Sequence, residues 1–302
     1  MANKLLFIAA DSNPRTIQYA KEKNLPADYI NYEDIFLTNS GFFNKDLERL
    51  DFSQYEKIIM FQGSNSFYKG TFVKALRNLF PKPRIYNVQN FPSYNWHWAN
   101  KFETYLAITE MGLISAKAPK TLAISHYTNP DQIIKTALLY FETFPLILKP
   151  TQGSRGDGVM KVDSEQELKD ALNDVHYKTK NYFVIQEFVE SETNFDVRVI
   201  TLRGNIIGAM KRTSTDPQEF RNNLSLGGSA ESYDYKDDHD LQHFIRDFHT
   251  RVSLFSTGFD FMYDHDGNLF MIELTTLPQS KGFNKINNIN FAKLKLDAII
   301  AD

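Results

Sequence analysis

The chain has 302 residues, of which 42% are hydrophobic and 24% charged, as is usual for a globular protein of two or three domains. Its net charge of −3 argues against a general electrostatic grip on nucleic acid, and no segment approaches a membrane span. There is no cysteine, which excludes disulfides and cysteine-ligated zinc, and the apolar run before Asp11 is too short for a signal peptide, so we expect a cytoplasmic protein.

Strands alternate with helices in the first part of the chain. Apolar runs predict strands at 4–10, 27–31, 55–61 and 84–88. The segments between them predict helices at 13–23 and 69–80. Pro14 stands early in the first helix, where a missing N–H is tolerated, and Pro81 ends the second. This alternation is typical of a parallel α/β unit, which we place at residues 1–92.

A second group of elements follows a connection at 90–100 that is dense in Asn, Pro and aromatic residues. We expect helices at 99–111, 131–141 and 164–175. Strands are expected at 121–124 and 146–150, and a further strand begins at Val159. Gly112 is the expected C-terminal stop of the first helix, and Ser164 with Glu167 forms a capping box. We assign this part to residues 93–181.

The segment after the strand at 146–150 is the most informative in this part. Lys149 lies at the end of the apolar run, and the loop that follows carries glycines at 153, 156 and 158. Positions without side chains let backbone N–H groups approach an anion, and the lysine ammonium adds positive charge. The pattern indicates a polyphosphate site, although it is not a P-loop because no Gly-Lys-Ser/Thr ends it. An ordinary turn is the alternative.

From Tyr182 the pattern changes to strands and hairpins, so residues 182–302 read as an antiparallel α+β part. Strands are expected at 183–188, 195–202, 206–212, 258–263 and 268–274. One helix is expected at 240–255. A two-residue loop at Asp266-Gly267 would place Asp260 opposite Glu273. Facing carboxylates repel unless one is protonated or a cation lies between them, and Mg²⁺ suits that place. A solvated face of an edge hairpin is the alternative.

A third cluster combines acidic and basic residues. Asp196 and Arg198 share one face of a predicted strand, and Lys211-Arg212 lies on its hairpin partner. Arg221 follows, shortly before Gly227-Gly228. Arginines suit bidentate recognition of phosphate or carboxylate, whereas surface salt bridges would explain Asp196 with Lys211 equally well.

Taken together, these motifs resemble the ATP-grasp enzymes, and among them the RimK-type carboxylate–amine ligases. The match runs in order across residues 95–300 and comprises Ile147–Pro150, Gly153–Val159, Gln186–Val189, Asp196–Arg198, Phe220–Asn223, Gly227-Gly228, Gly258–Asp260 and Ile272-Glu273. The resemblance implies an α/β pre-ATP-grasp domain (1–92), followed by an α+β ATP-grasp fold of two subdomains (93–181 and 182–302).

The resemblance also implies site residues. Two lysines and a glycine lid loop would hold the nucleotide phosphates: Lys101, Lys149, Gly153, Ser154, Gly156 and Gly158. Glu187, Phe188 and Val189 would form the adenine hinge, and Gln186, Asp196 and Asn223 would be further nucleotide-binding residues. Arg212 and Arg221 would be catalytic: Arg212 would stabilise the transferred phosphoryl group or the acyl phosphate, and Arg221 would face the triphosphate and the metal. The metal residues would be Asp260, Glu273 and Thr275. Thr275 stands where the family commonly has Asn and is a poorer Mg²⁺ ligand, so one or two ions remain open.

The implied function is an ATP-dependent, ADP-forming carboxylate–amine ligase that works through an acyl phosphate. It would add an amino acid such as glutamate to a peptide, protein or small-molecule acceptor, so ATP and these carboxylate and amine substrates are the expected partners. Neither nucleic acid nor a membrane is expected, and a homo-oligomer rests on analogy alone. An ATP-binding module without ligase turnover and an ATP-grasp kinase are the alternatives.

Overall fold

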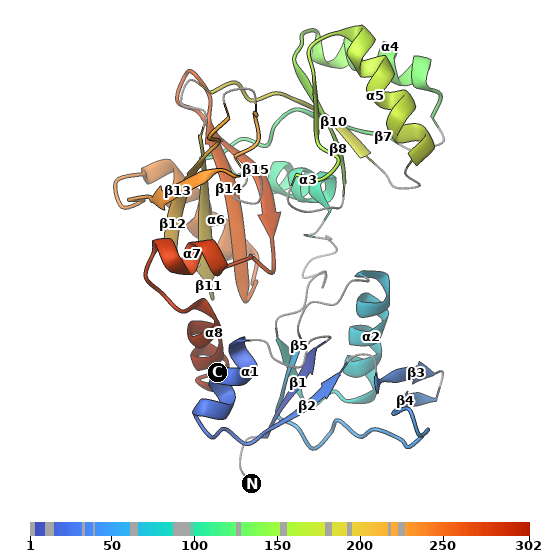
Figure 1. Ribbon diagram of the computed structural model, residues 1–302, viewed down its shortest axis with the longest axis vertical. Coiled ribbons are helices and arrows are strands. Elements are labelled where there is room, and N and C mark those ends of the chain that lie inside the picture. The colour runs from blue at the N-terminus through green and yellow to red at the C-terminus, as the bar shows by residue number, and fades with distance from the viewer. Residues whose placement is uncertain are drawn as a thin grey trace. The chain divides into compact units, whose positions relative to one another are not determined.

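A computed structural model describes residues 4–9, 15–31, 34–38, 40–60, 66–86, 98, 100–124, 128–151, 156–178, 183–191, 195–216, 219–222 and 227–302 (Figure 1). The chain divides into two compact units: Met1–Phe91 with Thr276–Asp302, and Pro92–Thr275. The domain boundaries predicted at 92 and 181 stay predictions. Among the residues that the structure describes, no helix is long and apolar enough to cross a membrane.

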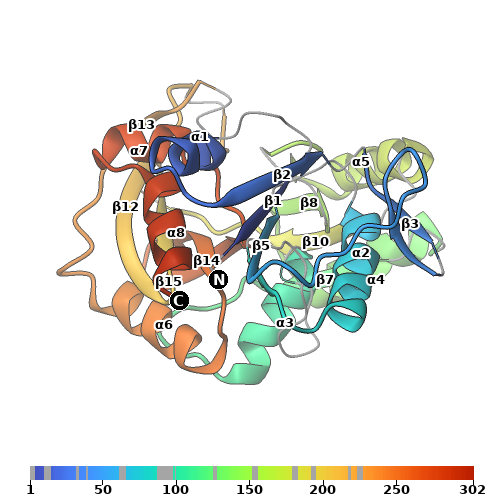
Figure 2. The same ribbon diagram turned by 90° about the horizontal axis from the view of Figure 1, so that it is seen from below.

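The first unit is built on a parallel sheet of order β2-β1-β5-β6. Its strands are β1 (Leu5–Ala9), β2 (Ala27–Asn31), β5 (Lys57–Met60) and β6 (Arg84–Tyr86). Helix α2 (Ser66–Leu79) covers one side of this sheet, and α1 (Arg15–Glu22) lies on the other (Figures 1 and 2). A short hairpin of β3 (Phe36–Thr38) and β4 (Gly41–Phe43), which the sequence analysis did not predict, is paired separately.

The C-terminal segment belongs to this first unit. It contains α7 (Lys281–Ile286) and α8 (Phe291–Ile300), and α8 packs beside α1 (Figure 2). The buried ammonium of Lys57 on β5 donates to the carbonyls of Ile299 and Ile300, at 2.8 and 3.2 Å. The last carbonyls of a helix have no partner within it, so this lysine satisfies the end of α8. A residue of the central sheet therefore ties the C-terminal helix to the N-terminal part of the chain.

The second unit contains a smaller antiparallel sheet of order β7-β10-β8-β9. Its strands are β7 (Thr121–Ile124), β8 (Leu146–Pro150), β9 (Met160–Val162) and β10 (Phe183–Glu187). Helices α4 (Pro130–Phe141) and α5 (Glu165–Lys178) cover it and share its apolar core (Figure 1). Half of the predicted capping box is present, since the Ser164 hydroxyl accepts the Glu167 N–H. The Glu167 carboxylate accepts the N–H of Asp163, one residue before the predicted partner Ser164.

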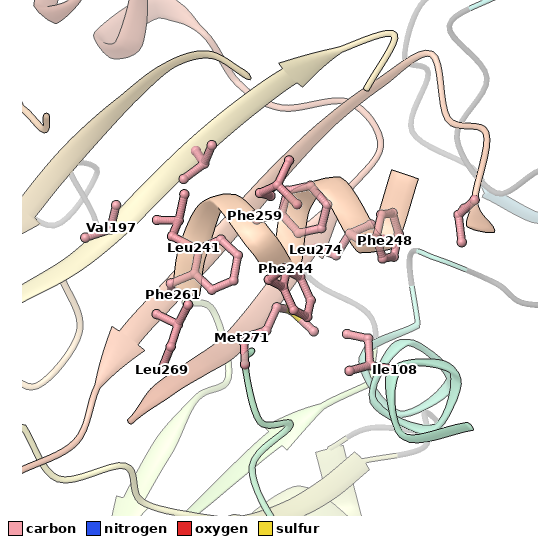
Figure 3. Close-up of a cluster of buried hydrophobic side chains, with 14 of the residues drawn as sticks. Ile108, Val197, Leu241, Phe244, Phe248, Phe259, Phe261, Leu269, Met271 and Leu274 are labelled. Carbon is pink, nitrogen blue, oxygen red and sulfur yellow. The ribbon is translucent and has the colours of Figure 1, made fainter. Parts of the chain in front are cut away.

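The larger sheet of the second unit has the order β13-β12-β11-β14-β15. Its strands are β11 (Phe195–Leu202), β12 (Asn205–Thr213), β13 (Ser229–Ser232), β14 (Ser256–Tyr263) and β15 (Leu269–Thr275). Phe244 and Phe248 of α6 (His239–Arg251) pack edge-on against Phe259 of β14, and Ile108 of α3 (Lys101–Met111) joins this core (Figure 3). Interlocked aromatic rings of this kind give a rigid base to the sheet.

The β14–β15 hairpin reaches the predicted pairing by a different route. The Asp264 N–H donates to the Asn268 carbonyl and the Gly267 N–H to the Asp264 carbonyl, so the loop has three residues and the predicted two-residue loop is wrong. Gly267 adopts a φ of 77°, which favours glycine. A β-bulge then shifts the register between Asp260 and Phe261. The two one-residue shifts cancel, and Asp260 lies opposite Glu273 as predicted.

Candidate functional site

One cavity in the second unit is lined by residues of both its sheets and of α3. Among the described residues, every predicted nucleotide, catalytic and metal residue lines this cavity, apart from Gly158 and Thr275. Gly153, Ser154 and Asn223 lie outside the described residues. The structure therefore brings together side chains that are far apart in the sequence.

Lys149 on β8 forms the buried cationic end of the cavity. Its Nζ donates to the Gln186 Oε1 at 2.7 Å and to the Tyr105 hydroxyl at 2.9 Å. Burial lowers the pKa of Lys149 to about 8. Gln186 was predicted among the nucleotide-binding residues, and its side chain holds the lysine and also donates to the Thr121 hydroxyl at 2.8 Å. Tyr105 was not predicted.

The hinge after β10 is anchored by backbone bonds. The Glu187 carboxylate accepts the Lys120 N–H at 2.7 Å, and the Glu187 N–H donates to the Lys120 carbonyl at 3.0 Å. The Phe188 N–H donates to the Pro145 carbonyl at 3.3 Å. The apolar wall of the cavity includes Phe188 and Val189 of this hinge, together with Ile147, Phe220, Met262 and Ile272. Such a wall suits a flat aromatic ring.

Two arginines surround Asp260 on β14. Arg198, directly across on β11, donates to both carboxylate oxygens at 2.7 and 2.6 Å, and Arg212 adds a contact of 2.9 Å. Burial by itself would raise the pKa of Asp260, but these guanidinium groups outweigh it and lower the pKa. Arg212 also donates to Asp196 at 2.5 Å. The four side chains form one charge-balanced network in which Arg212 and Asp260 are buried and Arg198 and Asp196 are slightly exposed.

The positive charge expected between Asp260 and Glu273 therefore comes in part from basic side chains of the protein itself. Asp260 is neutralised by the arginines, and the Lys101 Nζ lies 3.5 Å from the Glu273 carboxylate. Thr275 pairs with Gly258 and lies outside the cavity lining. Among the residues described, no group of three or more acidic or histidine side chains could hold a metal ion. Two carboxylates still meet the needs of Mg²⁺, which takes its remaining ligands from substrate phosphates and water.

Arg221 connects the glycine loop with the segment at 219–222. Its Nε and Nη2 donate to the Glu219 carboxylate at 2.8 and 2.7 Å, and its Nη1 donates to the Gly156 carbonyl at 2.9 Å. No role was predicted for Glu219. Its carboxylate aligns the guanidinium, so Arg221 lies over the cavity beside the described end of the glycine loop.

Comparison with known proteins adds independent findings. Residues 100–299 match the model of the RimK-like ATP-grasp domain. A tetrahydromethanopterin:alpha-L-glutamate ligase of Methanocaldococcus jannaschii is 27% identical over 79% of this chain and 76% of its own length. A coenzyme gamma-F420-2:alpha-L-glutamate ligase of Methanococcus maripaludis is also 27% identical, over 62% of each chain, so this match spans a little under two thirds of that relative.

Solved structures share the fold at low sequence identity. The VanG D-Ala:D-Ser ligase of Enterococcus faecalis superposes with a TM-score of 0.68 and 14% identity, over 100% of this chain and 99% of that one. A RimK domain ATP-grasp protein of Sphaerobacter thermophilus superposes with a TM-score of 0.65 and 12% identity, over 97% of this chain and 98% of that one. The predicted ATP-grasp fold is confirmed at this level.

Proposed function

The chain belongs to the RimK-like ATP-grasp family, and from this premise we propose that it is an ATP-dependent carboxylate–amine ligase. The observation that supports the proposal is the cavity of the second unit. It combines buried cations, an apolar wall beside an anchored hinge, and two opposed carboxylates. These are the groups needed to hold a nucleoside triphosphate with its metal ion.

In this proposal the nucleotide base lies against the apolar wall near the hinge, where Val189 follows the two anchored residues. The triphosphate extends toward Lys149 and Lys101. Lys149 directs two of its three N–H groups to Gln186 and Tyr105, and we assign the third to a phosphate oxygen. The glycine loop would cover the phosphates, because positions without side chains let backbone N–H groups approach an anion.

The reaction joins a carboxylate to an amine in two steps. A carboxylate oxygen of the first substrate attacks the terminal phosphorus of ATP, an acyl phosphate forms, and ADP leaves. The amine of the second substrate then attacks the acyl carbon, loses a proton, and expels inorganic phosphate as the amide forms. The chain holds its cationic groups in place beforehand, so they stabilise the charge of the transferring phosphoryl group without reorganising.

Individual residues carry separate parts of this work. Arg212 is 3% exposed and is fixed by Asp196 and Asp260, so its guanidinium presents a preorganised charge to the phosphoryl group. Arg221 would meet the phosphates from the side of the glycine loop. Asp260 and Glu273 would hold Mg²⁺, which when bound neutralises phosphate charge and orients the triphosphate.

For the substrates we propose an amino acid such as glutamate and a peptide, protein or small-molecule acceptor. The relatives named above join alpha-L-glutamate to different acceptors, so their names support the donor class and leave the acceptor undefined. A cytoplasmic location, the absence of nucleic acid among the partners, and a homo-oligomer stay parts of this proposal, the last by analogy alone.

Incubation with ATP, Mg²⁺, an amino-acid library and hydroxylamine tests the proposal. A hydroxamate formed together with ADP supports the ligase, because hydroxylamine traps the acyl phosphate. ADP formed with a stable phosphorylated alcohol would identify a kinase instead. Tight ATP binding with neither product would identify a binding module, an alternative that the position of Thr275 outside the cavity lining favours.

A further inference from the structure

We propose that Tyr105 is a positioning residue that holds Lys149 and the bulged strand β15 in one fixed arrangement, and that its hydroxyl thereby sets the affinity for nucleotide phosphates. The inference deepens the proposed function and rests on it, because it concerns the same cavity. Tyr105 does not belong to any of the motifs quoted for the family resemblance, so its part in the site comes from the structure.

The Tyr105 hydroxyl lies between two groups that belong to different sheets. It donates to the Ile272 carbonyl of β15 at 2.5 Å and accepts from the Lys149 Nζ of β8 at 2.9 Å. The same ammonium lies 5.3 Å from the centroid of the tyrosine ring, within the range of a cation–π contact. The side chain is 3% exposed, so water does not compete freely for these bonds.

The carbonyl that Tyr105 holds is at the β-bulge. Ile272 is the residue between Met271 and Glu273, which pair with Phe261 and Asp260 on β14. A bulge disrupts the ladder locally, and an extra residue needs a partner from outside the strand pair. The tyrosine hydroxyl provides that partner. It therefore stabilises the register in which Glu273 faces Asp260 across the two strands.

Helix α3 gives Tyr105 a firm support. The Asn100 side chain accepts the N–H groups of Phe102 and Glu103, which caps the helix, and the Lys101 N–H donates to the Thr151 carbonyl just after β8. Lys101 is one turn before Tyr105 and therefore on the same face, where its ammonium meets Glu273 at 3.5 Å. One helix face thus contacts both the phosphate-binding lysine and the acidic strand.

Removing the hydroxyl would leave two buried polar groups short of a partner. The Lys149 ammonium would keep Gln186 but lose the second of the two contacts that aim it at the cavity. The ring itself would remain, so the packing around α3 changes little in Tyr105→Phe. The expected defect is therefore a misplaced Lys149 ammonium, which weakens the binding of only those ligands that contact Lys149.

Calorimetric titration of Tyr105→Phe with ATP and with adenosine tests this inference, without metal and with Mg²⁺. We expect the affinity for ATP to fall about ten-fold, the size expected for a lost hydrogen bond to a charged group. The affinity for adenosine should be unchanged, because adenosine has no phosphate to meet Lys149. Tyr105→His, which keeps a ring that can donate and accept, should recover part of the ATP affinity and serves as a second variant if the phenylalanine variant does not fold.

Tyr55→Phe is the matched control. Tyr55 is also buried and also donates one hydrogen bond of 2.5 Å, to Asp28 in the first unit, so its loss should leave both affinities unchanged. An equal loss of ATP and adenosine affinity in Tyr105→Phe would show a merely structural role and overturn the inference, as would no loss at all. Failure of the unmodified protein to bind ATP would instead refute the proposed function.

Discussion

The buried network around Asp260 leads to a strong prediction for stability. In Asp260→Asn the side chain keeps its size, but Arg198 loses the carboxylate that holds it at 2.7 and 2.6 Å. Arg212 retains Asp196, so the largely buried guanidinium of Arg198, 16% exposed, is left without its counter-charge. Breaking a buried ion pair in this way costs about 3–5 kcal/mol. We expect a loss in that range in the free energy of unfolding.

Urea unfolding at pH 7, followed by circular dichroism and extrapolated linearly, measures this loss. The control is Glu231→Gln, which breaks the exposed Lys211–Glu231 pair in the same sheet and should cost less than about 1 kcal/mol. The double variant Asp260→Asn with Arg198→Gln should recover much of the loss, because it removes the unpaired charge as well. A loss below about 1 kcal/mol in Asp260→Asn alone would refute the reasoning, since an unpaired buried charge costs more than that.

Three further predictions concern other parts of the molecule. Glu273→Gln should abolish ADP formation and leave the thermal melting temperature nearly unchanged, since this carboxylate is partly exposed; near-normal turnover would remove Glu273 from the metal site. Burial lowers the pKa of His249 to about 4, below the pKa of about 6.5 that histidine has in the unfolded chain. The neutral His249 therefore contributes fully to the free energy of unfolding above pH 6.5, and up to about 3 kcal/mol is lost as the pH falls toward 4. Unfolding curves against pH should lose this slope in His249→Gln. Lys57→Met should lower stability by about 1–3 kcal/mol, because it leaves the carbonyls of Ile299 and Ile300 at the end of α8 without their donor. Lys4→Met, on the exposed pair with Asp28, is its control in the same unfolding assay.

Local patterns in the sequence were sufficient to predict several elements of the fold. The predicted strand at 195–202 coincides with β11, and the helix predicted to end before Gly112 ends there, with Gly112 at a φ of 60°. The pairing of Asp260 with Glu273 was correct for an incomplete reason. The loop is one residue longer than predicted, and the bulge near Asp260 restores the register. A bulge depends on contacts outside the hairpin, so the two strands alone do not predict it.

The sequence did not predict which partner each charged side chain contacts. Arg198 is 62 residues from Asp260 and meets it only because β14 pairs with β11, a neighbour that is not next in the chain. Tyr105 is part of an ordinary helix, and its spacing of four from Lys101 was the one local sign of a shared face. The placement of Thr276–Asp302 with the first unit depends on α8 meeting α1, a contact between the two ends of the chain. Sequence patterns report local conformation and leave such pairings open.

The division of the chain also has a consequence for biosynthesis. Because Pro92–Thr275 is inserted within the first unit, a ribosome completes the inserted unit before it has made the helix that finishes the surrounding one. Until α8 emerges, the Lys57 ammonium has no helix end to meet and α1 lacks the helix that packs beside it. Folding during translation therefore proceeds from the inside of the chain outward, and a nascent chain halted near residue 280 would expose the face of α1 that α8 covers to chaperones.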